Sequence, residues 1–216
     1  MTKQHMEKRM DWAEPKLTWN DETWRHIIFS DEKKFNLDGP DGFHYDWHDL
    51  NKEFQFYSKR AYGGGSVMIW AAFSSKGKTP IVFLNGRQSS INYINTLNEH
   101  LIPFGQSVDE NNWIFQQDNA SIHTAGTVKQ WFLENDINVL EWPAKSPDLN
   151  PIENLWGILA RNVYLNKPAY CSVSALKQAI QSEWGKIDEN VLKSLSNSMK
   201  TCVAACFRNR GKCINY

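Results

Sequence analysis

The first half of the chain alternates short apolar runs with polar turns, which is the pattern of a β-sheet. A β-branched and aromatic run at 25–30 predicts a buried strand that delivers Asp31 at its C-terminal end. Two more strands are predicted at 65–74 and 79–85, and the glycine and polar residues between them indicate a hairpin. These three strands are expected to form an antiparallel meander.

The second half of the chain shows helical spacing with short apolar runs between the helical segments. The pattern predicts a helix at 92–104, a strand at 113–117 that ends at Asp118, a helix at 124–134 and a strand at 138–142. From Pro151 onward the chain is helical in pattern, apart from a break near Lys167 and Pro168. Strands that alternate with helices favour parallel pairing, so we predict an α/β fold with a mixed five-stranded sheet, flanking helices and a helical C-terminal part.

Length and composition favour a single compact domain. The 216 residues, of which 41% are hydrophobic, can bury a core of ordinary size. The longest apolar stretches fall far short of the ~20 residues that a membrane-spanning helix needs. Because the charged N-terminus is also untypical of a secretory signal, we expect the protein to stay inside the cell, away from membranes.

Charge and cysteine content do not by themselves indicate a function. The 24 basic and 24 acidic residues give a net charge of zero, which offers no support for nucleic-acid binding. The four cysteines, all late in the chain, suit reduced thiols. The alternative is a zinc site at Cys202, Cys206 and Cys213, but no second pair of the Cys-x2-Cys type accompanies them.

Three acidic residues stand where predicted elements begin or end. Asp31 and Asp118 would lie about 5 Å apart if their strands were adjacent. Glu153 begins a helix whose apolar face would pack on the sheet. Three carboxylates that meet on a rigid scaffold need cations, and oxygen-only ligands suit Mg²⁺ or Mn²⁺. Two such ions would stabilise the attacking and leaving oxygens of a phosphodiester.

Each of these acids also has a purely structural interpretation. Asp31 would serve equally as a solvated turn residue, and Asp118 would favour the positive end of the helix that follows it. Asn150 as N-cap, Pro151 at the first helical position and Glu153 three residues past the cap match a capping box. None of the three acids taken singly identifies a metal site.

The three acids lie in three ordered sequence blocks, which are FSDEKKF (29–35), FQQDNA (115–120) and SPDLNPIENLW (146–156). These blocks resemble the signature blocks of Tc/mariner transposases. Thirty-four residues, 119 to 152, separate Asp118 from Glu153, and a glutamate as third acid resembles the nematode Tc branch. The mariner branch resembles the chain less, because it places aspartate there.

The resemblance implies a ribonuclease-H-like fold and the chemistry of DNA transposition. Asp31, Asp118 and Glu153 would be catalytic residues that bind two Mg²⁺ ions, for which Mn²⁺ would substitute. A metal-activated water would cut each strand at the ends of a transposable element, and the freed 3′ hydroxyl would attack target DNA at a TA dinucleotide. Such a substrate implies the nucleus.

The roles of three further residues stay open. His123, Lys145 and Arg161 are candidates for contact with DNA. For His123 the alternatives are a position next to the metal and simple packing at the start of a helix. For Lys145 and Arg161 the alternative is an ordinary solvated surface.

The resemblance also implies a division of the chain. Residues 1–24 would be a helical lead-in and residues 25–216 the catalytic domain, with an insertion at 36–62 that joins two subunits into a homodimer. Relatives carry two helix-turn-helix modules ahead of this domain, whereas about twenty-three residues precede the first strand here. We therefore expect weak, salt-sensitive DNA binding with little sequence preference. The alternatives are a metal-dependent nuclease without transposition, and a truncated or decayed copy that acts only as a non-catalytic DNA-binding or assembly protein.

Overall fold

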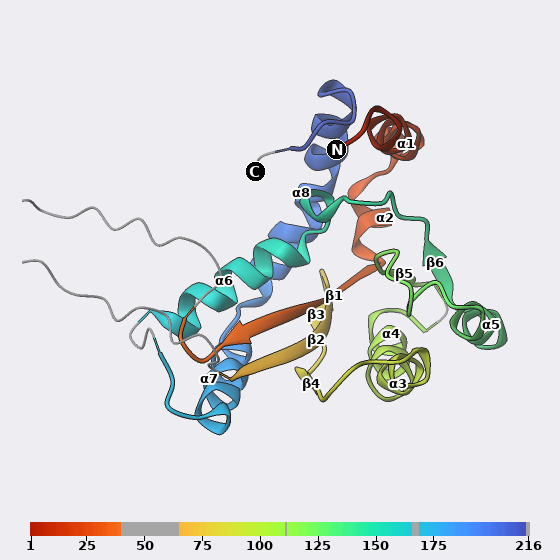
Figure 1. Cartoon of the computed structure of the whole chain (residues 1–216). Helices are drawn as coiled ribbons and strands as arrows, with labels where there is room; N and C mark the ends of the chain where they lie inside the picture. Colours follow the sequence, from red (N-terminus) through yellow and green to blue (C-terminus); the bar gives the residue numbers. More distant parts are fainter. Residues whose placement is uncertain (40–64, 111, 166–168, 215–216) are drawn as a thin grey trace, which may run out of the picture.

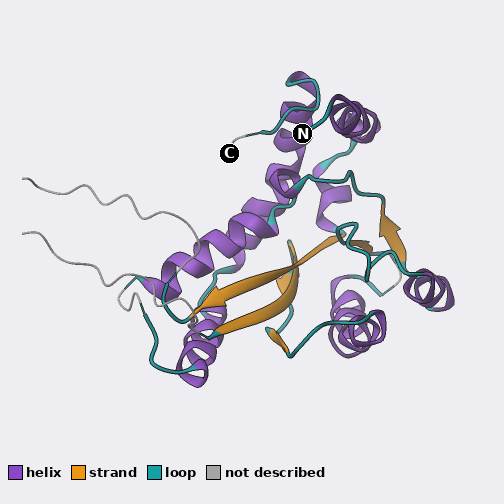
Figure 2. Cartoon of the chain, in the orientation of Figure 1, coloured by secondary structure: helices purple, strands orange, loops and turns teal. Residues whose placement is uncertain are grey.

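The computed structural model describes residues 1–39, 65–110, 112–165 and 169–214. Within these ranges, six strands form one mixed sheet in the order β3-β2-β1-β5-β6, with β4 also paired to β2. The strands are β1 (Ile27–Asn36), β2 (Ser66–Ser74), β3 (Gly77–Lys78), β4 (Val82–Leu84), β5 (Ile114–Gln116) and β6 (Asn138–Leu140). Helices pack on both faces of this sheet (Figure 1, Figure 2).

The predicted meander and the predicted parallel pairs are both present, but the described sheet has six strands instead of five. β2 pairs antiparallel with β1, β3 and β4, whereas β5 pairs in parallel with β1 and β6. Of the strand predicted at 79–85 only Val82–Leu84 is a strand, β4, while β3 at Gly77–Lys78 lies in the predicted hairpin connection. Thr79 bonds back to Ala72 through both its amide and its hydroxyl, and Pro80 has no N–H to add to the ladder.

β1 is the central strand and is longer than its apolar run. Its antiparallel pairing with β2 continues from Phe29 to Asn36, whereas its parallel pairing with β5 stops at Phe29 opposite Gln116. Asp31 therefore lies within the strand and not at its C-terminal end, so that prediction was wrong. Pairing with β2 extends β1 past Asp31. β5 ends before it reaches Asp31, so no strand pairs with β1 on that side of Asp31.

One face of the sheet carries the helices between β4 and β6. They are α3 (Ser90–Thr96), the π-helical turn η2 (Leu97–Leu101), α4 (Ile102–Val108) and α5 (Gly126–Glu134). The first three are continuous and run past the predicted end at residue 104. Pro103 has no N–H to donate and lies just after the π-helical turn η2, in which the Ile102 N–H bonds to the Leu97 carbonyl. Gly105 packs so closely on the Trp113 ring that a Cβ would clash.

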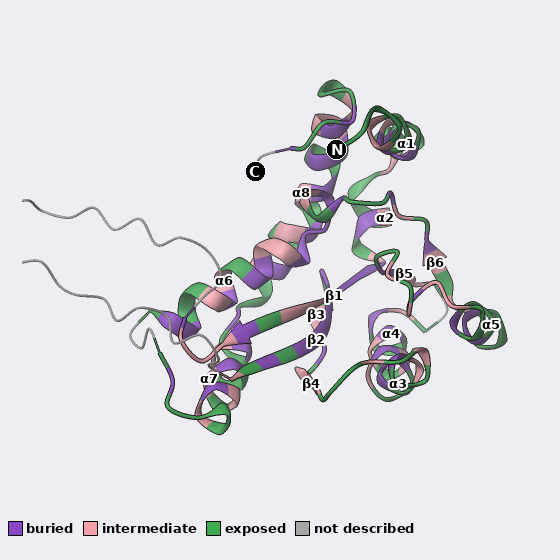
Figure 3. Cartoon of the chain, in the orientation of Figure 1, coloured by how far each residue is buried: buried purple, intermediate pink, exposed green. Residues whose placement is uncertain are grey.

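The other face carries the larger hydrophobic core and the remaining helices. They are α1 (Lys3–Ala13), the 3-10 helix η1 (Glu14–Thr18), α2 (Asp21–Arg25), the 3-10 helix η3 (Pro147–Leu149), α6 (Ile152–Tyr164), α7 (Val173–Gly185) and α8 (Glu189–Arg208). Buried residues run along β1 and β2 and recur along α6 and α8 (Figure 3). No helix in the described ranges is long and apolar enough to span a membrane.

The helical C-terminal part has one break more than predicted. Between α7 and α8 the buried Ile187 continues the apolar pattern, but Asp188 ends the run by capping α8, accepting from Asn190 N at 2.7 Å. The break expected near Lys167 and Pro168 falls outside the described residues. Of the insertion predicted at 36–62, residues 40–62 also lie outside them.

Candidate active site

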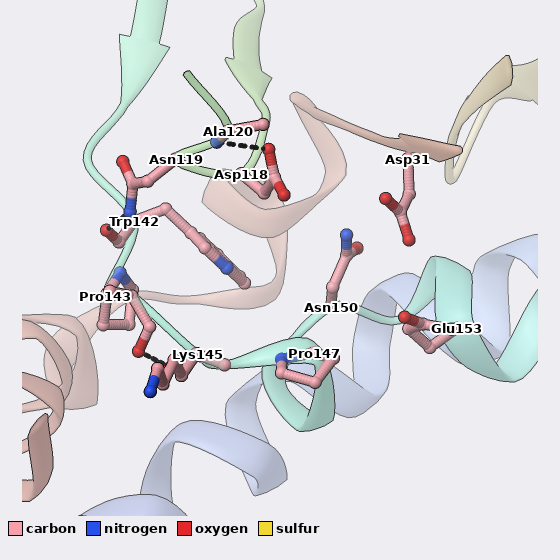
Figure 4. A pocket seen from close by; sticks show the side chains of 12 residues that line it. Asp31, Asp118, Asn119, Ala120, Trp142, Pro143, Lys145, Pro147, Asn150 and Glu153 are labelled. Atoms are coloured by element: carbon pink, nitrogen blue, oxygen red, sulfur yellow. Dashed lines mark hydrogen bonds between the residues drawn. The ribbon is translucent and has the colours of Figure 1, made fainter. Parts of the chain in front are cut away.

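A pocket of about 410 Å³ opens where β1 and β5 diverge, and all three predicted acids line it. Asp31 comes from β1, Asp118 follows β5, and Glu153 lies in the first turn of α6. The other lining residues are Asn119, Ala120, Trp142, Pro143, Ala144, Lys145, Ser146, Pro147 and Asn150. Asp31 and Glu153 point toward each other across the pocket, and Asp118 stands on the opposite wall (Figure 4).

Asp31 lies in the most negative part of the site. Burial, together with the negative charges of Glu153 and Glu32, raises the pKa of Asp31 to about 8. Its ionised form is therefore costly at neutral pH unless a cation lies nearby.

Asp118 has the opposite electrostatic setting. Its Oδ1 accepts a hydrogen bond from the Ala120 amide at 2.9 Å and lies 2.6 Å from Nδ1 of His123. Burial by itself raises the pKa of Asp118, but the hydrogen bonds from His123 and Ala120 and the charge of His123 lower it below its ordinary value. Asp118 is thus held as an oriented carboxylate before any metal arrives.

His123 lies in the turn before α5 and is only 3% exposed. Its Nε2 lies 3.3 Å from Glu32 Oε1, and its ring stacks on Tyr93 with the centroids 4.1 Å apart. Burial by itself lowers the pKa of His123, but hydrogen bonding to Asp118 and Glu32 raises it to about 9. The enclosed ring bridges two acids next to the pocket, so we interpret His123 by the metal-adjacent alternative that the sequence left open, and its contact with DNA stays a prediction.

Sequence reasoning missed Glu32. Successive side chains of a strand point to opposite faces, so Asp31 and Glu32 leave β1 in opposite directions. Asp31 faces Glu153 of α6, and Glu32 faces His123. The signal available in the sequence was the Asp31-Glu32 pair itself, an acid on each face of the same strand.

Glu153 does not take part in a capping box. The residue before α6 is Pro151, which makes no side-chain hydrogen bond, and the Asn150 N–H that a capping box would pair with Glu153 donates to the Pro147 carbonyl at 2.9 Å. Asn150 instead uses its Oδ1 to accept from the Ile152 amide at 3.3 Å and its Nδ2 to donate to the Ser30 carbonyl at 3.1 Å. The Glu153 side chain is left to line the pocket.

The remaining two candidates for DNA contact are placed differently. Lys145 lines the pocket, is exposed, and has a left-handed backbone with φ of 55°. A non-glycine residue in this region is strained, and such strain is common at functional sites. Arg161 is exposed on α6 but does not line the pocket with Glu153.

The donor set suits a hard divalent cation, although the acids are not drawn together as a closed cluster. Within the described ranges, no three His, Cys, Asp or Glu side chains form a group that would hold a metal ion as they stand. Unneutralised carboxylates repel each other, and Asp118 is held by His123 and Ala120 on its own wall. An oxygen-only set whose Asp31 resists ionisation fits Mg²⁺ or Mn²⁺. In the zinc alternative, Cys202 and Cys206 are buried in α8, whereas Cys213 is exposed.

Comparison with known proteins identifies the class to which this fold and site belong. A family model described as DDE superfamily endonuclease matches residues 26–177. The chain is 46% identical to the Tc3 transposase of Caenorhabditis elegans over 98% of its own length, and 35% identical to the Tcb1 transposase of Caenorhabditis briggsae over 88%. It spans 64% of the length of the first relative and 70% of the second. The chain therefore belongs to the Tc/mariner family of DDE transposases.

Solved structures agree on the fold. The mariner Mos1 paired-end complex with Mg superposes with a TM-score of 0.87 at 19% identity, covering 100% of this chain and 65% of that one. The Mos1 catalytic domain superposes with a TM-score of 0.77 at 20% identity, covering 100% of this chain and 98% of that one. The predicted ribonuclease-H-like fold is thereby confirmed.

Proposed function

We propose that this chain is the catalytic domain of a cut-and-paste transposase, which cuts DNA in a metal-dependent reaction and joins the freed ends to target DNA. The observation that carries the proposal is that Asp31, Asp118 and Glu153, three acids from separate elements, line the same pocket. Family membership supports the same chemistry, because the 46% identical relative is a transposase.

Asp31, Asp118 and Glu153 are the residues that would hold the metal, and we propose two Mg²⁺ ions with Mn²⁺ as a substitute. Mos1 structures exist with Mg and with Mn, which supports divalent metal use here. When bound, the ions would supply Lewis-acid stabilisation of the attacking and leaving phosphate oxygens.

The chain's own groups prepare this site in distinct ways. His123 and the Ala120 amide orient Asp118, and Glu32 holds the far side of the His123 ring. Asp31 and Glu153 face each other, so a shared cation would relieve their repulsion (Figure 4). Lys145 stands at the pocket edge, where its charge would contact the DNA backbone.

The partners follow from the same proposal. The DNA substrates would be transposon ends and a TA target, and the protein would act in the nucleus. The Mos1 transposase was solved as a paired-end complex with the left transposon end, which supports the binding of transposon ends and a homodimer for this chain. We assign residues 25–216 to the catalytic domain, residues 1–24 to its lead-in and the dimer contact to 36–62.

The test is cleavage of supercoiled plasmid in Mg²⁺ or Mn²⁺. The wild-type chain and Asp136→Asn, an exposed acid beyond α5, should nick DNA at the same rate, whereas Asp118→Asn should not. Joined products with a labelled 3′ end would establish strand transfer, and nicking without joining would leave a nuclease. A folded wild-type chain that binds Mn²⁺ but never cuts would favour the non-catalytic, decayed copy.

A further inference from the structure

A fully buried arginine lies outside the pocket, in α1. This residue, Arg9, is 0% exposed, and all three of its guanidinium nitrogens donate hydrogen bonds. Nη1 and Nη2 donate to the two carboxylate oxygens of Asp148, at 2.8 and 2.6 Å, and the pair is therefore bidentate. Nε donates to the Gly211 carbonyl at 2.9 Å, and Nη2 also reaches the Lys212 carbonyl at 3.3 Å. One side chain thus joins segments from the start, the middle and the end of the described chain.

Asp148 completes this junction from the other side. It lies in η3, and its Oδ2 also accepts a hydrogen bond from the Ile214 amide at 2.9 Å. Residues 211–214, called the tail here, approach α1 so closely that a Cβ on Gly211 would clash with the Met6 carbonyl. Gly211 also has φ of 71°, so the position suits glycine on both counts.

A second contact from α1 reaches the other end of the same segment. We call residues 141–150 the rim, because most of them line the pocket. Trp12 donates its Nε1–H to the Glu141 carbonyl at 2.6 Å, and its ring meets Trp142 edge-on with centroids 4.9 Å apart. The rim is therefore fastened to α1 at both ends, at Glu141 and Trp142 through Trp12 and at Asp148 through Arg9.

The rim leads directly to the acids. Asn150, two residues after Asp148, donates to the carbonyl of Ser30, the residue before Asp31. The Glu153 amide donates to the Asn150 carbonyl at 3.1 Å, which sets the first turn of α6. A displacement of the rim would therefore move Glu153 relative to Asp31.

We propose that Arg9 and Asp148 are positioning residues of the active site, which hold the rim so that Glu153 meets Asp31. The proposal rests on the function proposed above. Stability alone is a poor reason for this pair, because a buried ion pair is often replaced by apolar residues at no loss of stability. An apolar pair, however, would not fix the rim and the tail by directed hydrogen bonds.

The experiment uses that difference. The double variant Arg9→Met/Asp148→Leu removes the ion pair but fills its space. As control, Glu183→Leu/Lys186→Met removes an ion pair of the same 2.6 Å length, more exposed, between α7 and the residue that ends it. For each chain we would measure the melting temperature, amide hydrogen exchange by mass spectrometry, Mn²⁺ affinity and plasmid nicking.

If the pair positions the rim, the double variant should melt close to the wild-type temperature. Its amides in residues 141–153 and in the tail should exchange at least about tenfold faster than in the wild type, whereas the amides of β1 and β2 should exchange at the wild-type rate. The Kd for Mn²⁺ should rise by roughly ten- to a hundredfold, as is usual when residues that hold the metal ligands in place are removed. The rate of plasmid nicking should fall by at least the same factor. The control should match wild type in all four measurements.

The proposal is overturned if the double variant, folded, exchanges at the wild-type rate in 141–153 and binds Mn²⁺ within twofold of wild type. Should the double variant not fold, Arg9→Lys keeps the charge but loses the bidentate geometry, and the same two measurements on it decide. If the wild-type chain itself never nicks DNA, the proposed function fails, while hydrogen exchange in the rim still decides the positioning proposal.

Discussion

Two aspartates in one pocket have opposite electrostatic surroundings. Asp118 has a histidine at 2.6 Å and a backbone amide at 2.9 Å, and its pKa is lowered. Burial and the negative charges of Glu153 and Glu32 raise the pKa of Asp31 to about 8. The protein thus supplies a positive partner for one acid and leaves the other in need of an external cation, which is the state expected of a site built to capture metal.

The largest expected effect is on cleavage, where the two aspartates should behave alike. Asp31→Asn and Asp118→Asn should each reduce plasmid nicking by on the order of 10³-fold, because both remove a carboxylate from the proposed metal site. In the absence of metal they should differ. Asp31→Asn should raise the melting temperature in EDTA by removing a repelled charge, and Asp118→Asn should lower it by taking a partner from His123. Equal shifts of the same sign would show that the two surroundings are not opposed.

A smaller effect is expected from His123, which orients Asp118 without facing the pocket. His123→Ala should weaken Mn²⁺ binding by roughly ten- to a hundredfold, as is usual for residues that hold a metal ligand in place. His26→Ala, a half-buried histidine in the turn after α2, serves as the control and should leave Mn²⁺ binding unchanged. Titration calorimetry measures both, and a wild-type Kd for His123→Ala would contradict this role.

Without metal, the stability of the fold should also depend on pH. The folded-state pKa of Asp31, about 8, lies above its ordinary value of about 3.9. The contribution of Asp31 to the free energy of unfolding is therefore full below pH ~4 and is lost as the pH rises toward 8. For His123 the pKa is raised from 6.5 to about 9, so its contribution is lost between those values. Thermal melts in EDTA should therefore show falling stability from pH 5 to 9, with Mg²⁺ restoring it at the upper end. Asp31→Asn should flatten the acidic half of that curve, and an unchanged slope would count against the raised pKa.

The elements predicted best were those whose pattern is local. The strands around Phe29 and Phe115 and the helix that begins near Glu153 have apolar runs bounded by clear signals, and the structure contains all of them. The length of β1 was not predictable in this way, because β2 extends it past the apolar run. The end of the helix predicted at 92–104 was wrong because the helix continues through Pro103, by way of the π-helical turn η2, and through Gly105, which packs on the Trp113 ring. The local pattern treats both residues as helix breaks.

The site was predictable where short motifs determine it, and unpredictable where distant segments meet. The positions of Asp31, Asp118 and Glu153 followed from three sequence blocks, although their roles stay predictions. The enclosure of His123 depends on Tyr93 and Glu32, which lie far from it in sequence. Arg9 and Asp148 are 139 residues apart, and no spacing rule connects an arginine in a leading helix with an acid beside the third block.

The contact between α1 and residues 211–214 also affects how this protein can be engineered by circular permutation or by fusion to other domains. The two ends of the described chain lie beside each other at one corner of the molecule (Figure 1). A short linker between them would allow circular permutation, with new ends opened in an exposed loop elsewhere. A DNA-binding domain fused to either end would be attached at the same corner of the molecule. The distance that such a domain can span would therefore depend more on the length of its linker than on which end carries it.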